Sequence, residues 1–210
     1  MSDLARLTRP AAGQPDGALV LLHGRGADER DLYPLLDLLD PERRLLGVTP
    51  RAPLELPPGG RHWYALGGIP TPEPETFQQS VPLLAGLLDE LPVPLDRVVL
   101  GGFSQGAVMS WAMSLGPDRP RPAGILAMSG FLPRVEGWPL TLVGLKGLRV
   151  AIAHGALDPV ISVAYGREAR DALQAAGADV EWHETPVPHT IDPRVIGDLA
   201  RFVARAAPAD

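Results

Sequence analysis

One serine stands between two glycines in the pentapeptide Gly-Phe-Ser-Gln-Gly at residues 102–106. The apolar run at residues 97–101 precedes this pentapeptide, and a helical pattern follows at residues 105–115. A G-x-S-x-G turn between a strand and a helix holds the serine hydroxyl above the end of the strand, where it can act as a nucleophile. This context favours acyl transfer at Ser104 over the alternative, an ordinary glycine-rich turn.

A serine nucleophile needs a base, and three histidines follow Ser104 in the chain. His183 lies at the end of the last apolar run, where an alternating side chain faces the sheet or solvent. His154 ends an earlier apolar run. His189 lies in a loop between the last predicted strand and the last predicted helix, where it can reach over the carboxyl edge of a sheet. We therefore expect His189 to be the base, and His183 and His154 are weaker alternatives.

The base needs a carboxylate to orient it, and for a serine in this type of turn the chain order is serine, acid, histidine. Asp158 follows the apolar run at residues 148–153, so it lies at the edge of the sheet where Ser104 and His189 are expected. Asp179 precedes a strand and falls at the opposite edge. Asp192 is better explained as a helix cap, because proline follows it. The sequence thus predicts Asp158 as the acid.

Acyl transfer also needs backbone N–H groups that stabilise the oxyanion. We expect one from Gln105, directly after the nucleophile, and one from Arg25, in a glycine-containing loop after the first apolar run. The Arg25 side chain is expected to pair with Asp28 or Glu29, or to contact an anionic group of the substrate. A dinucleotide-binding loop is disfavoured, because Glu29 stands where the third glycine would be. His23 is expected to order this loop.

The elements that must position these residues can be recognised from their periodicity. Six short apolar runs occur at residues 18–22, 45–48, 97–101, 124–128, 148–153 and 180–182. Nearly continuous apolar runs are typical of strands buried on both faces of a parallel sheet. Helical patterns alternate with them at residues 77–91, 105–115, 162–176 and from 192 onward. We therefore predict an α/β fold with helices on both faces of a mostly parallel sheet.

The whole chain, residues 1–210, is predicted to form a single domain without a large cap domain. Residues 1–17 are expected to be an N-terminal extension or an edge strand. Residues 51–74 interrupt the pattern with six prolines and four glycines, and we expect either a surface excursion or an ordered loop near the active site. In that segment Trp63, Tyr64 and Leu66 are weaker candidates for substrate-binding walls, together with Leu132.

Composition excludes several classes of chemistry. The chain has no cysteine, which removes disulfides, metal–thiolate sites and cysteine nucleophiles. Its formal net charge of −6 and the lack of a dense basic run disfavour nucleic acid as a partner. No metal-binding pattern is present, so we expect neither a metal nor a cofactor. No apolar run has the length of a signal peptide or a membrane span, which predicts a cytoplasmic protein without stable membrane insertion.

Several motifs together resemble the phospholipase/carboxylesterase family of small α/β-hydrolases, which includes acyl-protein thioesterases. They are LHGRGAD, GGRHWYALGG, GGFSQGAVMS, SGFLP, HGALDPV and PHTI, and the resemblance runs from about Leu19 to Val203. It implies an α/β-hydrolase fold, a triad of Ser104, Asp158 and His189, and oxyanion N–H groups from Arg25 and Gln105.

Thioesterase members of the family typically carry leucine where this chain has Arg25 and glycine where it has Ala107 and Pro188. With these departures, the resemblance favours the bacterial carboxylesterase branch. It implies a serine carboxylesterase that hydrolyses small-molecule esters with short-to-medium acyl groups through an acyl-enzyme and without a cofactor. A lysophospholipase or an acyl-(protein) thioesterase on the same triad is the alternative. A non-catalytic binding protein with the same fold is a further alternative from another class. A homodimer is left open.

Overall fold

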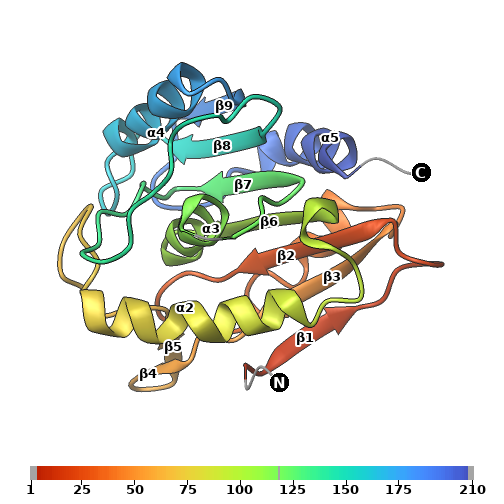
Figure 1. Cartoon of the computed structure of the whole chain (residues 1–210), viewed down its shortest axis with the longest axis horizontal. Helices are drawn as coiled ribbons and strands as arrows, with labels where there is room; N and C mark the ends of the chain where they lie inside the picture. The colour runs from red at the N-terminus through yellow and green to blue at the C-terminus, as the bar shows by residue number, and fades with distance from the viewer. Residues whose placement is uncertain (1–3, 118, 208–210) are drawn as a thin grey trace.

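Seven strands form one sheet in the computed structural model, which describes residues 4–117 and 119–207. The order across the sheet is β1-β3-β2-β6-β7-β8-β9, with β1 antiparallel to β3 and the other neighbours parallel. The strands are β1 (Arg6–Arg9), β2 (Gly17–Leu22), β3 (Leu45–Pro50), β6 (Val98–Phe103), β7 (Gly124–Met128), β8 (Arg149–Gly155) and β9 (Asp179–Thr185). Figure 1 shows the strands side by side across the molecule.

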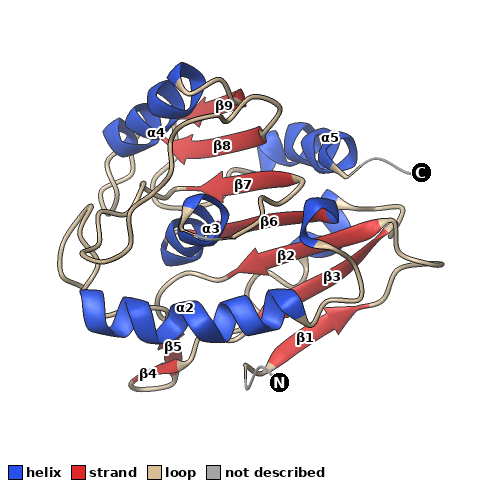
Figure 2. Cartoon of the chain, viewed as in Figure 1, coloured by secondary structure: helices blue, strands red, loops and turns tan. Residues whose placement is uncertain are grey.

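Helices cover both faces of this sheet, as the sequence predicts (Figure 2). One face carries α2 (Pro74–Asp89), α3 (Gln105–Leu115) and α4 (Val163–Ala175). The other face carries α1 (Leu35–Leu39) and α5 (Ile196–Ala206). Two short 3₁₀ turns, η1 (Leu95–Arg97) and η2 (Pro193–Val195), precede β6 and α5. The mostly parallel α/β architecture is therefore confirmed.

The central strand β2 shows why its sequence is apolar without interruption. Val20 and Leu22 pack with α2 and α3, whereas Leu19 and Leu21 pack with α1 and α5. Successive side chains of a strand point to opposite faces, so a strand covered on both faces needs an apolar residue at every position. All six residues of β2 are buried.

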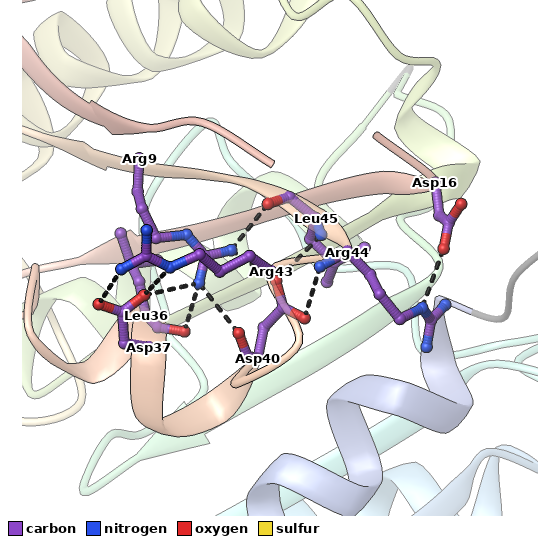
Figure 3. Close-up of polar contacts among 8 residues, drawn as sticks. All are labelled: Arg9, Asp16, Leu36, Asp37, Asp40, Arg43, Arg44 and Leu45. Carbon is purple, nitrogen blue, oxygen red and sulfur yellow. Dashed lines mark hydrogen bonds and ion pairs between the residues drawn. The ribbon is translucent and has the colours of Figure 1, made fainter. Parts of the chain in front are cut away.

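The first residues contribute an edge strand, β1, which a buried arginine ties to its neighbours (Figure 3). Arg9 is only 2% exposed, and its guanidinium donates to the Asp40 carboxylate at 2.5 Å. It also donates to the carbonyls of Leu36 at 2.9 Å and Leu45 at 2.7 Å. The backbone N–H groups of Arg44 and Leu45 donate to the same carboxylate. This network joins β1, the end of α1 and the start of β3.

A small hairpin and a short helix were not expected from the sequence. The segment 51–74 contains a small hairpin of β4 (Leu54–Leu56) and β5 (Gly60–His62). Strands of three residues are too short to show an alternating pattern. The helix α1 has five residues, fewer than two turns, so its periodicity is equally hard to recognise. Within the described parts of the chain, no helix has the length and apolar character needed to cross a membrane.

Candidate active site

Ser104 occupies a sharp turn between β6 and α3. Its backbone has φ 55° and ψ −119°, a conformation that non-glycine residues rarely adopt. A Cβ at Gly106 would lie 1.8 Å from the carbonyl oxygen of Leu22, and one at Gly102 would lie 2.6 Å from the same atom. Both glycines are therefore required by the close approach of β2 to the turn. Strain held in place by such packing is characteristic of functional sites.

His189 lies between Ser104 and Asp158. Its Nε2 is 3.0 Å from the Ser104 Oγ, and its Nδ1 is 2.6 Å from the Asp158 Oδ2. The other carboxylate oxygen of Asp158 accepts the N–H groups of Val160 and Ile161, each at 2.8 Å. Because this carboxylate accepts on both oxygens, the Nδ1–H of His189 donates to it. Nε2 is then left as the acceptor for the serine hydroxyl.

The remaining candidates for base and acid make other hydrogen bonds. His154 is the last residue but one of β8 and lies beside Asp158, with its Nε2 3.6 Å from the Asp158 Oδ2, but its Nε2–H donates to the Ile161 carbonyl at 2.8 Å. Burial lowers the pKa of His154, which favours the neutral imidazole. His183 lies within β9, at whose start Asp179 stands. Asp192 caps η2 by accepting the Arg194 N–H at 2.9 Å. The structure thus brings together Ser104, Asp158 and His189 and leaves these alternatives outside that chain of hydrogen bonds.

The two backbone donors expected for an oxyanion belong to segments that lie against the serine turn. Gln105 is the first residue of α3, so its N–H has no acceptor within the helix. The loop with Arg25 runs against the same turn, because a Cβ at Gly24 would lie 3.3 Å from the Ser104 Cβ. Among the described residues, the Arg25 N–H donates no hydrogen bond. Both N–H groups are therefore available to a ligand.

A buried histidine shapes the loop that carries Arg25. The His23 Nε2 accepts the Ala52 N–H at 3.0 Å, so its Nδ1–H donates to the Gly24 carbonyl at 2.7 Å. Burial lowers the pKa of His23, which favours this neutral form. The Trp63 indole donates to the His23 carbonyl at 2.9 Å. Through these contacts His23 orders the loop, as expected from the sequence.

The side chain of Gln105 has a contact that sequence reasoning missed. Its Oε1 accepts the Trp63 N–H at 3.0 Å, and its Nε2 donates to the Tyr64 carbonyl at 2.8 Å. Trp63 and Tyr64 are 0% and 2% exposed, so they lie in the core instead of on an open cleft wall. Segment 51–74 therefore contacts the Gln105 side chain through backbone atoms of Trp63 and Tyr64. Leu66 is exposed, and Leu132 lines a separate cavity of about 570 Å³ with Trp138.

The acids near Arg25 have other partners. Glu29 is 4% exposed and accepts two hydrogen bonds from Arg51, each at 2.6 Å. Asp28 accepts hydrogen bonds from the backbone and side chain of Arg30. Arg25 itself is exposed and has no ion pair among the described residues. The expected pairing of Arg25 with Asp28 or Glu29 is therefore wrong, because closer arginines occupy both carboxylates.

An apolar groove of about 390 Å³ borders the histidine. Its apolar lining comes from three parts of the chain that meet beside His189: Leu32, Leu35, Leu38, Phe103, Ile191 and Ile196. The Phe103 ring lies 4.8 Å from the His189 ring, centroid to centroid.

In the described parts of the chain, no group of three or more histidine, cysteine or acidic side chains is arranged to hold a metal ion.

A model of the phospholipase/carboxylesterase family matches residues 7–207. Acyl-protein thioesterase 1 of Debaryomyces hansenii is 26% identical over 232 residues, covering 97% of each chain. Acyl-protein thioesterase 1 of Mycosarcoma maydis is 40% identical over 129 residues, 58% of this chain and 53% of that protein. The crystal structure of the Bacillus cereus carboxylesterase, 23% identical, has a TM-score of 0.84 over 98% of this chain and 95% of its own, confirming the α/β-hydrolase fold.

Proposed function

Because the chain belongs to the phospholipase/carboxylesterase family of hydrolases, we propose that it is a serine carboxylesterase acting on short-to-medium acyl esters. The observation that carries this proposal is the His189 ring, which bridges the Ser104 Oγ at 3.0 Å and the Asp158 Oδ2 at 2.6 Å. These distances lie within the range needed for proton transfer between a nucleophile and its base. A non-catalytic binding protein would not require this alignment.

In the first half of the reaction, the Ser104 Oγ attacks the ester carbonyl while the His189 Nε2 accepts its proton. Asp158 holds the imidazole in the required tautomer and stabilises the imidazolium. The N–H groups of Arg25 and Gln105 donate to the oxyanion. The C–O bond to the alcohol then breaks, and His189 gives its proton to the departing oxygen. The acyl group remains on Ser104.

In the second half, water takes the place of the alcohol. His189 accepts a proton from that water, whose oxygen attacks the acyl carbon, and the same two N–H groups stabilise the oxyanion. Ser104 is released when its oxygen recovers the proton from His189. All of the steps use protein groups and water.

The test is covalent labelling with a fluorophosphonate, a probe that reacts with activated serines. We expect one adduct at Ser104 at neutral pH, located by peptide mass spectrometry, and none in Ser104→Ala. Ser114→Ala is the matched control: Ser114 is buried in α3, and its hydroxyl has no hydrogen-bond partner among the described residues. It should therefore keep both labelling and ester hydrolysis. An unlabelled wild-type protein that is folded would refute the proposal.

The second candidate is an acyl-(protein) thioesterase on the same triad, favoured by the similarity to two acyl-protein thioesterases. A lysophospholipase would use the same residues. The ratio of kcat/KM for a butyryl thioester to that for p-nitrophenyl butyrate separates thioesterase from carboxylesterase. Under the carboxylesterase proposal we expect the oxygen ester to be favoured. Release of fatty acid from a long-chain lysophosphatidylcholine at a higher kcat/KM than either would favour the lysophospholipase.

A further inference from the structure

The apolar groove has His189 in its lining, but its other lining residues have no part in the reaction described above. Three parts of the chain form it: the segment around α1, the end of β6, and the loop from His189 into α5. Leu38 lies at the rim with 57% of its surface exposed, whereas Leu32 and Leu35 are nearly buried beneath it. An exposed leucine above a continuous apolar lining is suited to an apolar ligand.

The chemistry of the proposed function determines which part of an ester lies there. The carbonyl carbon in the tetrahedral intermediate bears the Ser104 oxygen, the oxyanion, the acyl chain and the alcohol oxygen. The oxyanion faces the N–H groups of Arg25 and Gln105. The alcohol oxygen must come within hydrogen-bond reach of the His189 Nε2, because it leaves with the proton that this atom carries. The first carbon of the alcohol is therefore adjacent to His189, where the groove begins.

We propose that this groove is the binding site for the alcohol portion of the ester, and that it takes an unbranched apolar alcohol of medium length. This inference rests on the proposed function. Of the residues that line the groove, six are leucine, isoleucine or phenylalanine, and Asp31 is the only one with a formal charge besides the titratable His189. A cationic or strongly polar alcohol would gain little from such a lining. The volume of about 390 Å³ lies in the lower part of the usual range for small-molecule sites.

Two substrate series distinguish the alcohol from the acyl chain. The first keeps butyrate and varies the alcohol from methyl to hexyl. The second keeps p-nitrophenol and varies the acyl chain from acetyl to octanoyl. All members of the first series form the same acyl-enzyme, so any difference in kcat/KM arises before the alcohol departs. A fully buried methylene raises kcat/KM by about fourfold. Because the groove is open to solvent, we expect a rise of at least about tenfold from methyl to hexyl butyrate.

The variant Leu38→Gln tests the groove itself, since Leu38 is exposed and has no place in the catalytic machinery. We expect it to lower kcat/KM for hexyl butyrate about threefold to tenfold, with methyl butyrate within about twofold of wild type. The p-nitrophenyl esters all carry the same alcohol, so the variant should change kcat/KM for that series by one factor that does not depend on acyl length. Val143→Gln is the matched control: Val143 is 71% exposed and does not line the groove. The control should leave both series unchanged.

The outcomes separate this inference from the proposed function. Hydrolysis of the butyrates with no dependence on alcohol length would overturn the alcohol site and leave the esterase intact. A Leu38→Gln effect that grows with acyl length in the p-nitrophenyl series, and not with alcohol length in the butyrate series, would place the acyl chain in the groove and would also overturn the alcohol site. Absence of hydrolysis throughout both series would contradict the proposed function, and the alcohol site with it.

Discussion

The ion pair between Glu29 and Arg51 should stabilise the loop that carries Arg25, and we predict that Glu29→Gln destabilises the protein. The pair joins that loop to the residue after β3, with both carboxylate oxygens 2.6 Å from guanidinium nitrogens. The Glu29 side chain is only 5% exposed. Two hydrogen bonds from the Arg51 guanidinium lower the pKa of the Glu29 carboxyl from 4.5 to about 2.

The size of the effect follows from that difference in pKa. A difference of one in pKa between the folded and unfolded states corresponds to about 1.4 kcal/mol in the free energy of unfolding. The lowered pKa of Glu29 therefore contributes at most roughly 3 kcal/mol at neutral pH. The Arg51 side chain is 32% exposed, so solvent screening reduces this to about 1–2 kcal/mol. Because the folded pKa is the lower one, the contribution is complete well above pH 4.5 and disappears as the pH falls through about 2.

The assay is urea unfolding followed by circular dichroism, at several pH values from 7 to 3. We expect wild type to exceed Glu29→Gln by about 1–2 kcal/mol at pH 7, with more than half of the difference lost by pH 3. Glu168→Gln is the control, because Glu168 also lies 2.6 Å from an arginine but is 49% exposed. Its effect should stay below about 0.5 kcal/mol. A Glu29→Gln difference that is independent of pH, or no larger than the control, would refute the reasoning.

Three further perturbations test other parts of the structure. Gly106→Ala should lower the thermal midpoint sharply or prevent soluble expression, because its Cβ would lie 1.8 Å from the Leu22 carbonyl oxygen; a normal midpoint would contradict the close packing of the turn. Asp40→Asn leaves the buried Arg9 guanidinium with the half-exposed Asp37 as its one carboxylate partner among the described residues, at 3.2 Å, and should cost about 3 kcal/mol in urea unfolding; a loss below about 1 kcal/mol would show that Asp37 and the carbonyl acceptors suffice. Arg25→Leu should lower kcat/KM for an anionic ester about threefold to tenfold at low salt, with a neutral ester unchanged; an unchanged ratio would remove any role for this cation in substrate choice.

The residues that sequence reasoning placed well are those whose position follows from the path of the backbone. In a parallel sheet, the loops that follow the strands all emerge at one edge. The sequence therefore places three residues at that edge without any need to know the order of the strands: Ser104 after β6, Asp158 after β8 and His189 after β9. In the structure these three residues are in contact. The same rule brings the loop after β2 to the serine, because β2 and β6 are neighbours.

Side-chain partners were harder to predict, because they depend on burial and on contacts between distant residues. Arg25 was expected to pair with Asp28 or Glu29, or to contact an anionic group of the substrate, but Glu29 pairs with Arg51, whose position is set by the end of β3. Trp63 and Tyr64 were expected to face the cleft, since aromatic residues in a loop suit either a binding wall or a core. The burial of both side chains, 0% and 2% exposed, decides for the core, and the Gln105 amide holds the backbone of both residues there.

The order of the strands also explains why the groove lies on the His189 side of the serine. The strand β9 forms the edge of the sheet, separated from β6 by β7 and β8. The loop after β9 must therefore return across the sheet edge before His189 can reach Ser104, and Asp158, after the intervening β8, meets it on the way. Having crossed, the chain enters α5, which packs with α1 on one face of the sheet. The returning loop and these two helices enclose an apolar space next to the imidazole. The crossing that brings His189 between Ser104 and Asp158 thus also builds the groove to which we assign the alcohol.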